Sequence, residues 1–83
     1  ISSIKIAKNL ADSIKNLDKF VTTSKSYVLG YLGQVYESQQ KYPEARNLTE
    51  QALLISQSIN AGNLSYLWQW QLGRILKQQG NIN

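Results

Sequence analysis

The single proline of the chain, Pro43, is the feature that most restricts how the sequence can fold. Proline has no N–H to donate and a fixed φ, so it suits the first turn of an α-helix and disrupts a helix interior. Glu44 follows it, and a carboxylate stabilises the positive amino-terminal end of a helix. We therefore predict that a helix starts near Pro43 and that a tight turn over residues 40–43 separates it from an earlier helix.

The segment after Pro43 carries apolar residues at alternating spacings of three and four, namely Ala45, Leu48, Ala52, Ile55 and Ile59. This spacing places them on one face of an α-helix over residues 42–60. Two of the five are alanines, whose small side chains let a neighbouring helix backbone approach closely. The pattern therefore predicts a helix that packs tightly along this face.

The segment before the turn, residues 24–40, has a matching apolar stripe made of Val28 or Leu29, Leu32, Val35 and Tyr36. Gly33 lies beside this stripe in the middle of the expected helix. A glycine there costs about 1 kcal/mol relative to alanine, which close helix packing can offset. We expect the two helices to pack against each other in antiparallel orientation.

Two further helices are expected, one at each end of the chain. In residues 1–17 the apolar positions with helical spacing are Ile4, Ala7, Leu10 or Ala11, Ile14 and Leu17. Residues 18–23 are interpreted as a connection, with Thr22, Thr23 or Ser24 as the cap of the next helix.

The last helix is expected to begin at Asn63, a good capping residue, after a left-handed Gly62 ends the third helix. Gly80 is expected to close it. Its buried side is predicted to consist of Leu64, Trp68, Leu72 and Ile75 or Leu76. The fold class is therefore all-α, with four antiparallel helices.

The central region resembles the tetratricopeptide repeat. The residues in the order and spacing of that signature are Leu29, Leu32, Gly33, Tyr36, Tyr42, Ala45, Ala52 and Leu53. Two positions depart from it, because Thr49 replaces an aromatic residue and Gln57 replaces a proline. The resemblance implies an α–α superhelix whose repeat-packing residues are Leu29, Leu32, Gly33, Tyr36, Ala45, Ala52, Leu72 and Gly73.

A second, partial copy of the motif is visible, because Leu32-Gly33 parallels Leu72-Gly73 at a shift of 40 residues. This period is longer than the usual 34 or so. We interpret residues 1–83 as one fragment of a repeat domain: residues 1–20 as the second helix of a preceding repeat, 24–60 as a complete repeat and 63–83 as the first helix of the next. The central region also resembles, more weakly, the repeats of bacterial and cyanobacterial proteins with a CHAT domain.

The family resemblance implies a function in binding proteins. In that family a second stripe on each first helix lines a concave groove that contacts peptides. The matching residues of this sequence are Tyr27, Tyr31, Gln34, Glu37, Trp70, Arg74 and Lys77. Trp70 is the most informative, since tryptophan is enriched at binding hot spots and Arg74, four residues later, could stack on its ring. The alternative is that a neighbouring repeat covers Trp70.

Composition excludes several other classes of function. The 83 residues include neither cysteine nor histidine, which removes thiolate metal sites and the commonest acid–base residue. The remaining carboxylates do not converge, so we expect no enzyme, no cofactor and no metal site. No apolar run approaches the length of a membrane span. A cytoplasmic location is expected.

Basic residues outnumber acidic ones by nine to five, giving a net charge of +4. Several lysines lie early in the chain and could attract phosphate groups or acidic peptides. Because Asp12 and Asp18 interrupt them, a solvated helix face explains them better than nucleic-acid binding. We therefore expect a scaffold that binds another protein or peptide. The alternatives are a spacer or self-association module, including homo-oligomers formed through exposed repeat ends, and weak nucleic-acid binding through the first helix.

Overall fold

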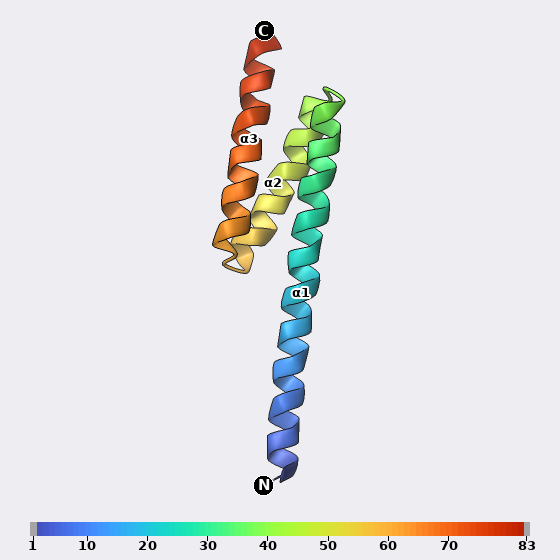
Figure 1. The fold of residues 1–83 in the computed structure, drawn as a ribbon, viewed down its shortest axis with the longest axis vertical. Coiled ribbons are helices and arrows are strands. Elements are labelled where there is room, and N and C mark those ends of the chain that lie inside the picture. Colours follow the sequence, from blue (N-terminus) through green and yellow to red (C-terminus); the bar gives the residue numbers. More distant parts are fainter. Residues whose placement is uncertain (1, 83) are drawn as a thin grey trace.

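The computed structural model describes the backbone of residues 2–82 and the side chains of residues 9–10 and 12–80, and its described part contains three α-helices and no strand (Figure 1). Helix α1 spans Ser2–Ser38, α2 spans Tyr42–Ser58 and α3 spans Gly62–Ile82. The chain runs along α1, returns along α2 and runs forward again along α3, so α1 and α3 are parallel. The all-α prediction is confirmed. None of the helices in the described part is long and apolar enough to cross a membrane.

The prediction of four helices was wrong, because the first two are one continuous helix of 37 residues. The hydroxyls expected to cap a new helix bond backward inside the existing one. Thr23 Oγ1 donates to the carbonyl oxygen of Lys19 at 2.7 Å, and Ser24 Oγ donates to that of Phe20 at 2.9 Å. Such bonds are compatible with an unbroken helix. Residues 18–23 are therefore helical, and residues 2–20 belong to the same helix as residues 24–38.

Both turns use the same hydrogen-bonded motif. Gln40 and Asn60 adopt left-handed backbone conformations, with φ of 62° and 56°. The N–H groups of the residues that follow, Lys41 and Ala61, donate to the carbonyl oxygens of Tyr36 and Ser56, each at 2.9 Å. This six-to-one bond is the Schellman helix ending. α2 then begins at Tyr42 with Pro43 in its first turn, as predicted from the proline.

Neither of the two glycines that were expected to terminate a helix does so. Asn60, and not Gly62, takes the left-handed position, and asparagine tolerates it better than most residues. Gly62 is instead the first residue of α3. The helix also continues through Gly80 to Ile82, since a single glycine costs only about 1 kcal/mol in a helix and does not terminate it.

Small side chains form the contact between α1 and α2. Ser26 and Gly33 are buried on α1, and they face a row of buried small residues on α2, namely Ala45, Thr49, Ala52 and Ser56. A Cβ on Gly33 would lie 2.7 Å from Thr49 Oγ1 and 3.2 Å from the Ala45 carbonyl oxygen. The helices thus approach as closely as backbone and small side chains allow.

The large apolar stripe expected at this contact lies elsewhere. Val28, Leu32 and Val35 are exposed on the outer side of α1. A helix can bury only one face against a close neighbour, and the glycine face permits the closer approach. The large residues of the core come instead from α3: Leu64, Trp68 and Ile75 are buried, with Ala52 of α2 in the same cluster and Leu29 packed against it.

Candidate functional site

Three side-chain contacts join the parallel helices α1 and α3. Trp68 Nε1 donates to Ser26 Oγ at 2.9 Å, and Gln71 Nε2 donates to the Gly30 carbonyl oxygen at 2.9 Å. One turn further along, Arg74 Nε and Nη2 donate to the two carboxylate oxygens of Glu37 at 2.6 and 2.7 Å. These contacts fix the spacing of the two helices whose exposed sides form the predicted groove.

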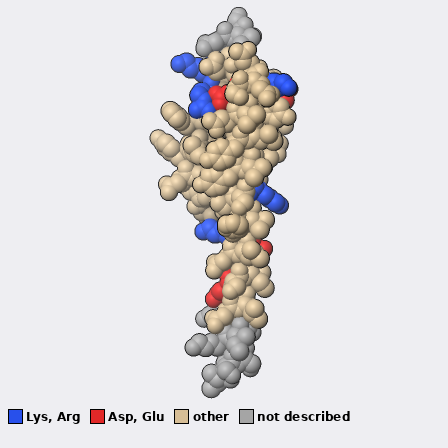
Figure 2. Space-filling model, turned by 45° about the vertical axis from the view of Figure 1, so that its right-hand side comes forward, with Lys and Arg blue, Asp and Glu red and all other residues tan. Residues whose placement is uncertain are grey.

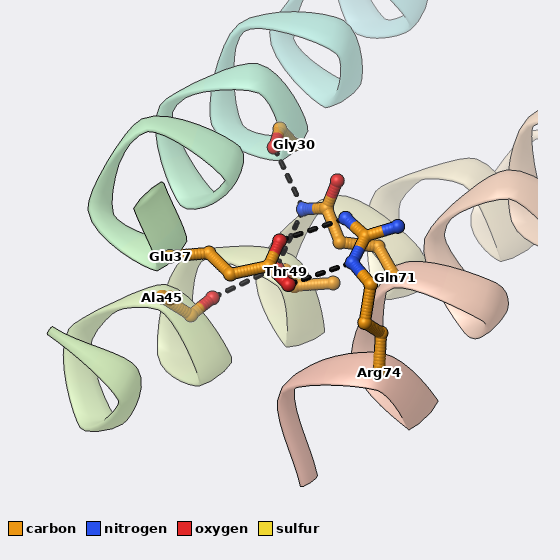
Figure 3. A network of polar contacts seen from close by, with 6 residues as sticks. All are labelled: Gly30, Glu37, Ala45, Thr49, Gln71 and Arg74. Atoms are coloured by element: carbon orange, nitrogen blue, oxygen red, sulfur yellow. Dashed lines mark hydrogen bonds and ion pairs between the residues drawn. The ribbon is translucent and has the colours of Figure 1, made fainter. Parts of the chain in front are cut away.

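The middle contact belongs to a buried polar network (Figure 3). The Gln71 amide, 4% exposed, also donates to Thr49 Oγ1 at 2.9 Å, and Thr49 Oγ1 donates to the Ala45 carbonyl oxygen at 2.8 Å. Ser26 Oγ similarly donates to the Ala52 carbonyl oxygen at 2.7 Å. Among the described side chains, no buried nitrogen or oxygen atom lacks a hydrogen-bond partner. The network is complete in itself and therefore structural.

The third contact, between Arg74 and Glu37, combines an ion pair with an aromatic ring. The two hydrogen bonds that Arg74 donates to Glu37 raise the pKa of the Arg74 guanidinium. The negative charge of the Glu37 carboxylate acts in the same direction, while partial burial opposes both. The Arg74 guanidinium carbon also lies 5.9 Å from the centre of the Trp70 ring, within the range of a cation–π contact. Arg74 is therefore held between α1 and an exposed tryptophan of its own helix.

A hollow of about 360 Å³ opens beside this ion pair, between α1 and α3. It is lined by Gln34, Glu37, Ser38, Tyr42, Arg74 and Gln78. Three of these residues, Gln34, Glu37 and Arg74, were predicted to line a groove. Glu37 and Arg74 neutralise each other. The polar groups left to interact with a ligand are therefore mainly the amides of Gln34 and Gln78 and the hydroxyls of Ser38 and Tyr42. Such groups suit the donors and acceptors of a peptide backbone.

Two tyrosines lie further along the same side of α1. The rings of Tyr27 and Tyr31 stack with centres 5.9 Å apart. Both meet the buried Trp68 edge-on, with ring centres at 6.2 and 5.9 Å. They are 41% and 54% exposed, so each ring is fixed on one side and open to solvent on the other. A rigid, half-exposed aromatic pair is a suitable surface for an apolar side chain of another molecule.

Trp70 stays largely exposed on α3, at 71%, and Tyr66 beside it is 75% exposed. A shallow hollow of about 450 Å³ is lined by Asn63, Tyr66, Leu67 and Trp70. A second hollow of about 320 Å³ contains Trp70, Arg74 and Lys77. No other part of the described chain covers Trp70.

The predicted repeat-packing residues fall into three groups. Ala45, Ala52 and Gly33 are buried at the contact of α1 and α2, while Leu29, Tyr36 and Leu72 are half-buried. Leu32 is exposed. Gly73 also differs from the prediction, because it is exposed and a Cβ added to it would meet no atom within 4 Å. The parallel between Gly33 and Gly73 in the sequence therefore does not extend to their surroundings.

The sequence analysis missed Ser26, Gly30 and Gln71 as buried contact residues. A signal was present, since Ser26, Gly30 and Gly33 are small residues spaced by four and three positions. A Cβ on Gly30 would overlap the ring atoms of Trp68. Gly30 is thus the surface on which Trp68 rests, and only the pairing of α1 with α3 reveals this.

The basic residues do not gather in one place. The side chains of Lys5 and Lys8 lie outside the described residues, while Lys15, Lys19 and Lys25 are exposed along α1 with Asp12 and Asp18 between them. On the face shown in Figure 2, positive and negative groups are scattered along the length of the molecule. The described side chains include no cluster of three metal-ligating residues.

Comparison of the chain with protein-family models, with curated proteins and with solved structures gives no significant match.

Proposed function

We propose that this chain is a protein-interaction module related to the tetratricopeptide repeats, and that it binds a segment of another polypeptide along the exposed sides of α1 and α3. The support for the relationship is local. Two antiparallel helices meet through Gly33 and Ala45, a short turn follows, and a third helix begins parallel to the first. The family signature has an aromatic residue where Thr49 stands, and here the Gln71 amide fills the space beside the threonine.

The single observation that carries the proposal is the hollow between α1 and α3. It brings together Gln34, Glu37 and Arg74, which come from helices about 40 residues apart in the sequence. The groove mechanism follows from its chemistry. The amides bind the backbone of a peptide segment, and the exposed aromatic surface at Trp70 binds its apolar side chains.

A displayed library of random peptides, selected on the immobilised 83-residue chain, tests the proposal. We expect selected peptides to lose at least tenfold in affinity when Trp70→Ala and Gln34→Ala are combined, because one aromatic anchor and one backbone-binding amide are lost. Leu54→Ala is the matched control, since Leu54 is exposed on α2, away from the hollow. Selected peptides that bind the control and the double variant equally would contradict groove binding.

The alternative function, a spacer or self-association module, is favoured by the exposed apolar residues of α1 and α3. Sedimentation of the Trp70→Ala and Arg74→Ala variants separates it from groove binding. If these variants lose oligomers while no peptide ever binds, self-association is the function of that surface and the scaffold proposal fails.

A further inference from the structure

The outer face of α1 carries a continuous row of residues that α2 and α3 leave at least partly exposed, apart from the edge-on contact between Tyr31 and Trp68. The row runs at alternating spacings of four and three and consists of Leu10, Ile14, Leu17, Val21, Ser24, Val28, Tyr31 and Val35. Its seven large members are between 45% and 64% exposed. A strict repeat of seven residues over this length is the pattern of a coiled-coil seam, in which alternate positions are named a and d.

In this register, Ile14, Val21, Val28 and Val35 occupy a positions, and Leu10, Leu17, Ser24 and Tyr31 occupy d positions. All four a residues are β-branched and two of the four d residues are leucine, so the row can form an apolar helix–helix seam. The contacts of α1 with α2 and α3 use other positions: Ser26 and Gly33 are at f, and Gly30 and Glu37 are at c. Positions c and f lie on the side opposite to a and d. A second helix can therefore lie along the seam without displacing α2 or α3.

The amino-terminal half of α1 makes this surface unusual. It extends alone beyond the turn that joins α2 to α3 (Figure 1). A single helix with no neighbour is marginally stable in water, since helices in proteins depend on packing of an apolar face. Leu10, Ile14 and Leu17 provide such a face, and no part of the described chain covers it.

We propose that two copies of this chain associate through α1 in an antiparallel two-stranded coiled coil. In the antiparallel register each a residue faces a d residue of the other copy. Leu10 then faces Val35, Ile14 faces Tyr31, Leu17 faces Val28, and Val21 faces Ser24. The projecting half of each helix covers the exposed half of the other, so all the a and d residues from 10 to 35 are buried together.

Charge selects this orientation. The exposed Asp18 and Lys25 both occupy e positions, on one flank of the seam. In the antiparallel register e residues face e residues, so Asp18 of each copy lies near Lys25 of the other, and two ion pairs form. In a parallel dimer Lys25 would lie beside Phe20 instead. The exposed Phe20, at g, lies near Tyr27 of the other copy in the antiparallel arrangement.

Sedimentation equilibrium tests the association. We expect the 83-residue chain to form a dimer whose dissociation constant rises at least 100-fold in Leu17→Lys, because two lysines then enter the apolar seam. Asn16→Lys is the matched control, since it adds the same charge to the neighbouring exposed residue outside the seam. Leu17 is exposed in the single chain, so the near-ultraviolet circular dichroism of the two tryptophans of α3 should persist. A monomer at all concentrations, or equal weakening by both variants, would overturn the proposal.

Cysteine cross-linking tests the orientation. Because the native chain contains no cysteine, any disulfide that forms must join the introduced residues. A mixture of Leu10→Cys and Val35→Cys chains should form a disulfide-linked heterodimer, because the two positions face each other. Neither variant alone should cross-link, since identical positions lie about 37 Å apart in the antiparallel register at 1.5 Å per residue. Gln51→Cys on α2 is the control for random collisions. Cross-linking of Leu10→Cys with itself would show a parallel dimer, and no cross-linking above the control would show no seam; either result rejects the proposal.

Discussion

The two faces of α1 differ in a way that decides how the chain folds. The inner face presents Ser26, Gly30 and Gly33, and it is the face that packs against α2 and α3. The outer face presents Val28, Leu32 and Val35, which are more hydrophobic but exposed. In this chain the buried face of α1 is the one that allows the closer helix approach, although it is the less hydrophobic of the two. Its small residues let the whole Trp68 ring, and a side-chain donor of α3, reach the backbone of α1.

The two tryptophans provide the largest expected effect. Trp68→Ala should lower the free energy of unfolding by about 3–5 kcal/mol, since the residue is 1% exposed and fills the space between α1 and α3. Trp70→Ala should change it by less than about 0.5 kcal/mol, since Trp70 is 71% exposed. Urea unfolding followed by circular dichroism measures both. Equal effects would mean that burial does not distinguish the two rings.

A buried glycine of α1 and an exposed glycine of α3 give the next comparison. Gly30→Ala should destabilise the chain by about 1–3 kcal/mol, because the new methyl overlaps the Trp68 ring. Gly73→Ala should stabilise it by up to about 1 kcal/mol, because its methyl meets no atom within 4 Å and alanine favours the helix. The same unfolding experiment serves, and a stabilising Gly30→Ala would show that Trp68 does not rest on this glycine.

The buried network predicts an intermediate effect. Thr49→Val removes the hydroxyl that accepts from Gln71 and should cost about 1–2 kcal/mol, although the shape of the side chain is kept. Gln71 retains its bond to the Gly30 carbonyl oxygen, which limits the loss. Ser58→Ala is a suitable control, since the Ser58 hydroxyl bonds only locally and is exposed. A Thr49→Val chain as stable as this control would show that the network contributes little.

The ion pair between α1 and α3 should have the smallest effect. A double-mutant cycle on Glu37→Gln and Arg74→Gln should give a coupling of about 1 kcal/mol or less, since the Arg74 side chain is 41% exposed and water screens the pair. Raising the salt concentration should reduce this coupling further. A coupling well above 2 kcal/mol would mean that the pair is a principal link between the helices.

Much of the chain's organisation could be predicted from single residues. Pro43 and Glu44 located the start of α2, and the helical spacing of apolar residues predicted an all-α fold. The same spacing could not show that α1 continues through Thr23 and Ser24. A hydroxyl in that position either caps a new helix or bonds backward within an existing one, and the two outcomes have the same local sequence.

The candidate site was predicted only in part, because the local sequence of a helix does not show which of its polar residues reach another helix. Gln34, Glu37 and Arg74 were identified from their places on two helices, and the structure brings them to one hollow. Gln71 was not, because a glutamine on a helix is usually solvated, and its burial depends on reaching the Gly30 carbonyl oxygen from another helix.

By itself, the sequence determined the turn before Pro43 and which residues share a helix face, since both follow from local backbone chemistry and the period of the helix. Only the tertiary structure decided which face of α1 is buried. That choice depends on the fit of Trp68 against Gly30, between residues 38 positions apart in the sequence, and no periodicity within one helix contains that information.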